Sequence, residues 1–154
     1  MATNYIAVPP GSASAPNVII RAYDTTGTIV AGNLTIPTIQ NITINNSNDV
    51  FTWTQLNESA KLQQATTSTN SVATTVVVEA ATFFGDGGVT TGANALGLIG
   101  LSVAKTRVEI RTKIGTKNFV ANAYVTGLAP TVSADQPVWT TPVTFTVSGE
   151  YTTF

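Results

Sequence analysis

The sequence predicts a mainly β domain, a sandwich or barrel of two packed, mostly antiparallel sheets with one helix on its flank. Short apolar runs separated by turn-forming residues occur along the whole chain, as in all-β domains. Only one segment, about 93–104, has apolar residues at helical spacing. A chain of 154 residues has the usual size of a single domain. We therefore treat residues 1–154 as one unit.

The clearest strand covers residues 106–114, where apolar and charged residues alternate. This period of two is typical of a strand with one buried and one polar face. Gly115 and Thr116 then allow a turn, and residues 119–125 return, so that the two runs predict a hairpin. The apolar positions of the first strand are Val108, Ile110 and Ile114, and the charged ones are Arg107, Glu109, Arg111 and Lys113.

The N-terminal third predicts an arm and short strands. Residues 1–17 contain one apolar run followed by PPGSASAP, which favours an extended arm. Residues 18–23 predict a strand that returns from Ile29 in a hairpin. Pro37 interrupts the next apolar run, which indicates an edge strand, a bulge or two short strands. Residues 50–56 then form a strand with Phe51 and Trp53 on one face.

The middle of the chain predicts a loop, a central strand and the helix. Residues 57–72 are polar and low in complexity, which indicates a long exposed loop with room for a short helical turn. Residues 73–84 are β-branched and nearly uninterrupted, as in a strand covered on both faces. The helix at about 93–104 contains glycines, which it tolerates if it packs closely on a sheet. The predicted core is Val76, Val78, Phe83, Val108, Ile110, Phe119, Val143, Phe145 and Val147.

The composition excludes several kinds of chemistry. The chain has no Cys and no His, so disulfides, thiolate catalysis and cysteine zinc sites are impossible. Its eight carboxylates are scattered, and GDGGVTTG lacks both the GK[ST] ending and the GxGxxG spacing of nucleotide-binding loops. We therefore expect no enzymatic activity, no cofactor and no metal. The N-terminus has no signal-peptide pattern and no apolar run is long enough to span a membrane.

The surface should favour association between copies. Charged residues make up only 10% of the chain and the net charge is −1, so copies repel each other weakly. Composition alone favours a self-assembling protein and an ordinary β-protein of Thr-rich, secreted type about equally.

The C-terminal third resembles a known family. FVANAYVTG, followed by a loop containing SADQ and a terminal strand ending in VSGE, is similar to the C-terminal half of major tail tube proteins of long-tailed, siphovirus-like bacteriophages. The resemblance is good over residues 106–150 and looser before them. It implies a β-sandwich with one helix that closes into hexameric rings, which stack into the DNA-ejection conduit.

The resemblance also implies partners and places of contact. The partners would be copies of the chain itself, the tape-measure and other tail proteins, and passing double-stranded DNA bound without specificity, with no membrane. The protein would be made in the host cytoplasm and end in the virion tail. The arm and the loop at 57–72 would contact neighbouring copies. The self-assembly candidates are Tyr5, Ile6, Val8, Glu58, Lys61, Leu62, Gln64, Trp139, Tyr151 and Phe154.

Two alternatives share the same broad fold. Trp53, Trp139 and Tyr151 could form a stacking platform of a carbohydrate-binding or adhesin-like module. A phage capsid decoration protein is the other alternative.

The basic residues of the strand at 106–114 raise a question for a DNA conduit. A wall of unpaired basic rings would hold DNA, which carries one negative charge per roughly 1.7 Å of its axis. We therefore expect the basic side chains either to pair with acids, Glu109 and also Glu79 or Asp135, or to face away from the channel. The bland alternative is a solvated strand face. The residues concerned are Arg107, Arg111 and Lys113.

Overall fold

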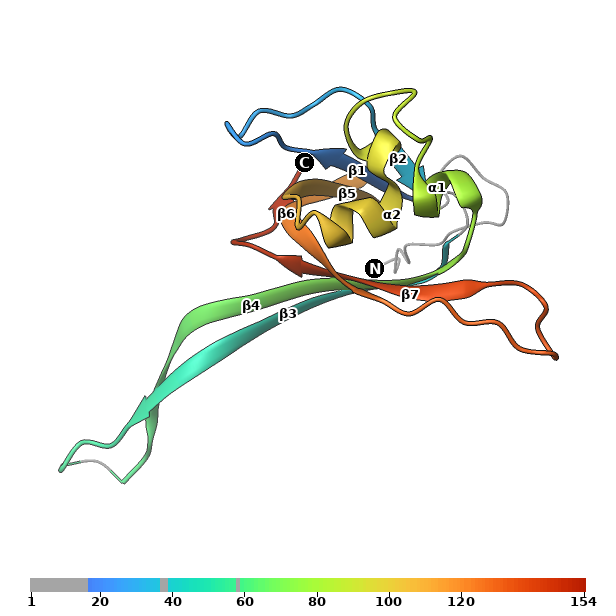
Figure 1. The fold of residues 1–154 in the computed structure, drawn as a ribbon. Coiled ribbons are helices and arrows are strands. Elements are labelled where there is room, and N and C mark those ends of the chain that lie inside the picture. The colour runs from blue at the N-terminus through green and yellow to red at the C-terminus, as the bar shows by residue number, and fades with distance from the viewer. Residues whose placement is uncertain (1–16, 37–38, 58) are drawn as a thin grey trace.

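The computed structural model describes residues 17–36, 39–57 and 59–154. Over these residues the chain forms strands and two helices, which confirms the mainly β class (Figure 1). Tyr5, Ile6 and Val8 of the arm, as well as Pro37 and Glu58, lie outside the described residues. The elements are β1 (Val18–Ala22), β2 (Leu34–Ile36), β3 (Ile39–Trp53), β4 (Leu62–Val77), α1 (Ala80–Phe84), α2 (Ala93–Val103), β5 (Val108–Ile114), β6 (Lys117–Leu128), β7 (Thr140–Val147) and β8 (Thr152–Thr153).

The strands form one continuous antiparallel sheet rather than two separate ones. Its order is β2-β1-β5-β6-β7-β4-β3, and β8 pairs with β6 beside β7. The two halves of the sheet nevertheless face each other, because Val18 of β1 and Val72 of β4 line the same small internal cavity. The packing of a sandwich is thus achieved within one folded sheet, because the long strand β6 pairs with β5 at one end and β7 at the other.

The predicted hairpin at 106–125 is present as β5 and β6. Ile114 pairs with Lys117 across a two-residue turn, and Gly115 has the positive φ of 61° that such a turn requires. The alternation also holds, since Val108 and Ile110 are buried while Glu109 and Arg111 are only partly so. Ile114 is the exception because it lies at the turn, where it is 37% exposed.

The core lies between the sheet and α2. Seven of the predicted core residues are buried, including Phe145, which is completely so. Val78 and Phe119 are only partly buried: Val78 follows the end of β4, and Phe119 packs on Tyr151 near the edge of the core. The seven buried residues are Val76, Phe83, Val108, Ile110, Val143, Phe145 and Val147.

The prediction of a long exposed loop at 57–72 is wrong from Leu62 onward, where the chain is a strand, although residues 62–69 are unburied as predicted. Leu62 begins β4, which pairs with β3 through a long antiparallel ladder. Thr, Ser and Asn line both faces of this outer segment, so no apolar alternation marks it as a strand. The predicted central strand at 73–84 is wrong at its end, because β4 stops at Val77 and α1 follows.

The predicted helix is present, but its glycines have another purpose. The helix α2 is interrupted at Gly97, where φ is 67° and ψ is 179°. A Cβ there would lie 2.3 Å from the nitrogen of Gly85 and 2.6 Å from the carbonyl oxygen of Phe83. Gly97 therefore allows α1 to approach α2, rather than α2 to approach the sheet. In the described part of the chain neither helix is long and apolar enough to cross a membrane.

The remaining N-terminal predictions hold in part. The return strand expected from Ile29 is reduced to a single bridge with Tyr23. The run around Pro37 is split into the two strands β2 and β3, one of the outcomes that its proline indicated.

Candidate assembly surfaces

The most unusual surface is the outer half of the β3/β4 hairpin. It projects far from the body of the molecule, which comprises the two helices and the rest of the sheet (Figure 1). From Asn45 to Trp53 and from Leu62 to Thr69, no residue of either strand is buried. Two-stranded hairpins are at best marginally stable in water without further packing. The hairpin therefore lacks the apolar support that the body has.

Side-chain hydrogen bonds between polar residues cross this hairpin. The Asn46 amide donates to Asn70 Oδ1 at 2.5 Å, and Ser68 Oγ donates to Asn48 Oδ1 at 2.6 Å. Farther out, Thr67 Oγ1 donates to Asp49 Oδ2 at 2.8 Å. These bonds fix the pairing of the strands where no buried face does so.

The tip of the hairpin carries apolar side chains that are largely exposed in the described chain. Phe51 stacks on Trp53 with ring centroids 5.7 Å apart, but is itself 59% exposed. Leu56 is fully exposed beyond the end of β3. Lys61 and Gln64 are also exposed, and Leu62 is partly buried. Sequence reasoning missed Leu56 and Phe51 as candidates, although an apolar residue in a turn-rich segment was the available signal.

Tyr151 joins the hairpin to the body. Its hydroxyl lies 2.6 Å from the carbonyl oxygen of Asn45 and 2.9 Å from that of Ser71, to which it donates. Its ring packs on Phe119, with centroids 4.7 Å apart. Burial raises the pKa of this phenol above its usual value of 10. This assembly candidate thus has a contact inside its own chain.

Besides the free sides of the short strands β2 and β8, the sheet has two edges without strand partners in the described chain. No strand pairs with the outer edge of β3. On β6, the pairing with β5 ends at Ala123, so that residues 124–128 have no strand on that side. A depression of about 500 Å³ lies along this second edge, lined by Ser102, Lys105, Tyr124, Val125 and Thr126.

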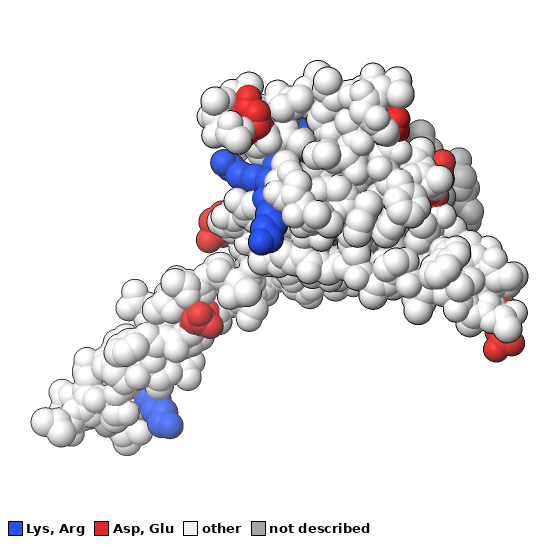
Figure 2. Space-filling view, viewed as in Figure 1, with Lys and Arg blue, Asp and Glu red and all other residues white. Residues whose placement is uncertain are grey.

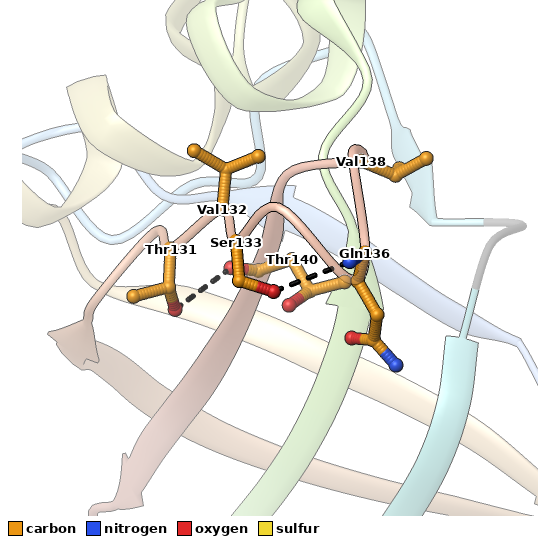
Figure 3. Close-up of a pocket in the computed structure, with 6 residues that line it drawn as sticks. All are labelled: Thr131, Val132, Ser133, Gln136, Val138 and Thr140. Atoms are coloured by element: carbon orange, nitrogen blue, oxygen red, sulfur yellow. Dashed lines mark hydrogen bonds between the residues drawn. The ribbon is translucent and has the colours of Figure 1, made fainter.

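A second projection, the β6–β7 loop, lies at the opposite end of the strands from the hairpin tip (Figure 1). Backbone bonds of 2.8 and 2.9 Å between Thr131 and Thr140 close its base, and the Gln136 nitrogen donates to Ser133 Oγ at 3.2 Å. The loop forms a pocket of about 180 Å³, and Figure 3 shows Val132 and Val138 on the same side of it. Both valines are about half exposed, as is the assembly candidate Trp139 beside them.

The charged strand face lies on β5 and its neighbour β1. Glu109 Oε1 accepts from Arg21 Nη2 at 2.5 Å and lies 3.6 Å from Arg111 Nη2. Arg107 lies over the ring of Tyr23, with 4.4 Å from its Cζ to the centroid. Lys113 is exposed, and among the described residues none of the three predicted basic residues, Arg107, Arg111 and Lys113, forms an ion pair with Glu79 or Asp135. The candidate Phe154 covers Arg111, whose Cζ is 5.1 Å from the ring centroid.

The face of β3, β4 and β7 that points away from the core is different, because it carries no charge near the body. β6 separates it from β5 in the sheet order. Figure 2 shows few coloured atoms on the body, and the blue ones gather near one end of it. The uncharged face is formed by Asn41, Thr43 and Asn45 of β3, Ser71, Ala73 and Thr75 of β4, and Pro142, Thr144 and Thr146 of β7.

The structure does not gather the three aromatic residues of the carbohydrate alternative. Trp53 ends β3 at the hairpin tip, whereas Trp139 immediately precedes β7 near the opposite projection (Figure 1). In the described chain their ring contacts join Trp53 to Phe51 and Tyr151 to Phe119. No group of three acidic side chains that could hold a metal occurs among those residues either.

The glycine-rich segment before α2 is a structural loop. Asp86 accepts hydrogen bonds from the backbone of Gly88 and Thr90 and from the Thr90 hydroxyl. The Thr90 hydroxyl contributes most to holding the pKa of this carboxyl below its usual value. The carboxylate thereby fixes its own loop.

Comparison with known proteins gives matches in structure alone. No protein-family model matches the chain, and no curated protein sequence does. The fold is similar to a chain in the tail of an empty gene transfer agent particle of C6 symmetry, with a TM-score of 0.62, 13% identity, and coverage of 88% of this chain and 93% of that one.

Two further structures extend this similarity. A chain of the anti-feeding prophage baseplate, 6-fold symmetrised, has a TM-score of 0.63 at 9% identity, with 96% of this chain and 97% of that chain covered. The SPP1 tail tube protein has a TM-score of 0.62 at 10% identity, with 89% and 76% covered. The chain therefore has the fold found in phage tail tubes and related particles.

Proposed function

We propose that the chain is a structural, non-enzymatic subunit of a phage tail tube, in which six copies close into a ring and rings stack into a conduit for DNA. One observation carries this proposal: apart from the short strands β2 and β8, the sheet leaves two different edges unpaired, the outer edge of β3 and residues 124–128 of β6. When two different edges meet between copies, the contact is head to tail, and such contacts close into rings if the rotation per copy fits.

Strand pairing across this contact would satisfy the β6 edge and part of the longer β3 edge. The backbone groups of an exposed strand edge readily accept a strand of another chain. The outer edge of β3 is long, and charge does little to block it, since Asp49 is the only charged residue of that strand. The depression along the β6 edge leaves room for an incoming strand. The 6-fold symmetry of the similar particles supports six copies.

The uncharged face of β3, β4 and β7 suits the wall of a channel. Phosphates are attracted to Lys and Arg through counterion release, so a neutral wall holds passing DNA weakly. In this arrangement the face bearing Arg107, Glu109, Arg111 and Lys113 points away from the channel. Thr75→Lys should leave tubes intact, but make them retain double-stranded DNA at low salt and release it at high salt.

The other partners follow from the same assignment. In a tail tube, the tape-measure protein would occupy the channel during assembly, and further tail proteins would cap the tube. The protein would be made in the host cytoplasm and end in the virion tail. The arm at 1–17 would contact a neighbouring copy, so a chain without residues 2–14 should fold but no longer polymerise.

Electron microscopy of purified protein at high concentration tests the proposal directly. Rings or tubes support it, and monodisperse monomers that bind glycans contradict it. A shortened variant tests the part played by the hairpin: an Asn-Gly turn replaces residues 48–68, joining the paired residues Ser47 and Thr69. We expect this shortened variant to be a folded monomer that forms no rings.

Point substitutions test the β6 edge itself. Thr126→Lys adds a charge beside this edge, a device by which natural edge strands avoid pairing. Ring formation should fall about tenfold or more. Thr28→Lys makes the same change in the exposed loop after β1 and should leave assembly unchanged. Equal assembly by both variants would exclude the β6 edge from the contact.

A further inference from the structure

We propose that the β6–β7 loop of one copy is the receptor for the hairpin tip of a copy in the next ring, with Leu56 seated between Val132 and Val138 and Lys61 beside Asp135. This inference rests on the proposed tube. It adds which surfaces meet when one ring stacks on another.

The two surfaces lie where stacking requires them. The hairpin tip and the β6–β7 loop are at opposite ends of the strands (Figure 1). A copy placed above another in the same orientation therefore brings the tip of one toward the loop of the other. Because the two surfaces differ, the contact can repeat from ring to ring without limit.

The loop is a formed receptor rather than a loose connection. Besides the bonds at its base, Ser133 and Gln136 exchange backbone bonds of 3.2 and 3.4 Å across the turn. Figure 3 shows the Val132 and Val138 side chains directed to one side of the loop, and the Gln136 amide to the other. A receptor that is already ordered loses little conformational freedom on binding.

The tip supplies an apolar group of suitable size. Leu56 has no cover in the described chain, and the pocket of about 180 Å³ is bordered by two half-exposed valines. Burying the leucine there would remove apolar surface of both copies from water.

Charge complements shape at the same two ends. Lys61 is the basic residue of the tip, and Asp135 is the acidic residue of the loop. Both are exposed, and neither forms an ion pair in the described part of the chain. Figure 2 shows a blue group on the projecting hairpin and a red group at the opposite projection. A single exposed pair contributes little, but the pair repeats with every copy around a ring.

Two single variants and their mixture test this contact. Lys61→Asp places two acidic residues, 61 and 135, at the proposed contact, and Asp135→Lys places two basic ones there. We expect each variant alone to form rings whose stacking into tubes falls about tenfold or more. Preformed rings of one variant, mixed with preformed rings of the other, should stack alternately into tubes, because each tip then meets a loop of opposite charge. Glu150→Lys changes an exposed acid elsewhere and should stack normally.

Two quantities are measured at low salt: the length of tubes in electron micrographs and the fraction of protein that pellets on centrifugation. Val138→Ser and Leu56→Ser should shorten tubes without affecting rings. Tubes of normal length from both charge variants, or no recovery on mixing, would overturn the inference. Absence of rings from the unaltered protein would instead contradict the proposed function, which separates the two failures.

Discussion

The strands β3 and β4 run from the body into the outer hairpin, but different interactions stabilise them in the two regions. In the body, β4 alternates buried and partly buried residues from Asn70 to Val77, and its register follows from the core. In the hairpin, no residue from Leu62 to Thr69 is buried, and side-chain hydrogen bonds set the pairing instead. The interactions that stabilise β4 thus change along its length. Apolar/polar alternation in a sequence therefore indicates that one face of a strand is buried, and a strand without a buried face lacks it.

The largest expected contrast between the two regions concerns phenylalanine. Phe145 is completely buried, so Phe145→Ala should lower the free energy of unfolding by about 3–5 kcal/mol. Phe51→Ala in the hairpin removes a ring that is 59% exposed and should change it by less than about 0.5 kcal/mol. Chemical denaturation of the monomer measures both. Similar losses would show that the hairpin has a core of its own.

A second contrast concerns carboxylates. Glu109 is mostly buried between Arg21 and Arg111, so Glu109→Gln should cost about 1–3 kcal/mol of stability, because hydrogen bonds to charged groups are the stronger kind. Asp49→Asn, at the exposed hairpin bond to Thr67, is the matched change and should cost less. The comparison fails if the hairpin substitution is the more destabilising one in the monomer.

Tyr151 lies where the hairpin meets the body, and removal of its hydroxyl should destabilise the base of the hairpin selectively. Tyr151→Phe keeps the contact with Phe119 but loses the hydrogen bond to the hairpin, which contributes about 1 kcal/mol. Hydrogen exchange should increase at the base of β3 and β4 and stay unchanged in β5. Equal increases in both would mean that the phenol supports the whole fold.

The smallest expected effect is the pH dependence of stability that arises from Tyr151. Since the folded state raises the pKa of Tyr151, the phenol holds its proton more tightly in the folded than in the unfolded chain. This contribution to stability is complete below pH 10 and is lost as the pH rises through the higher pKa of the folded state. Denaturation from pH 9 to 11 should show this loss in the unaltered protein, and a smaller one in Tyr151→Phe.

The sequence predicted those elements that have one buried face. Burial of one face gives a strand an apolar/polar period of two, which can be seen in the sequence. The predictions therefore hold for the alternation at 106–114, the turn at Gly115 and the apolar residues Val143, Phe145 and Val147. The segment at 62–69 was taken for a loop because both of its faces are polar. The helix α1 was taken for a strand because Ala80 and Phe84 continue a β-branched run whose end no turn residue marks.

The candidate surfaces were predicted less well than the fold. Composition was compatible with association between copies, but neither the unpaired edges of β3 and β6 nor the loop pocket has a local signature, since both arise from strand order. Leu56 and Asp135 stand out only when the structure shows them at opposite ends of the molecule.

The side-chain bonds across the hairpin constrain how its length can vary among related chains. Asn46 opposes Asn70 and Asn48 opposes Ser68, so each bond requires that both partners keep their places. Insertion of one residue in a single strand would misalign all bonds beyond it, whereas insertion of one residue in each strand would keep them aligned. We expect natural variants to lengthen or shorten this hairpin by matched insertions and deletions, with the body left as it is.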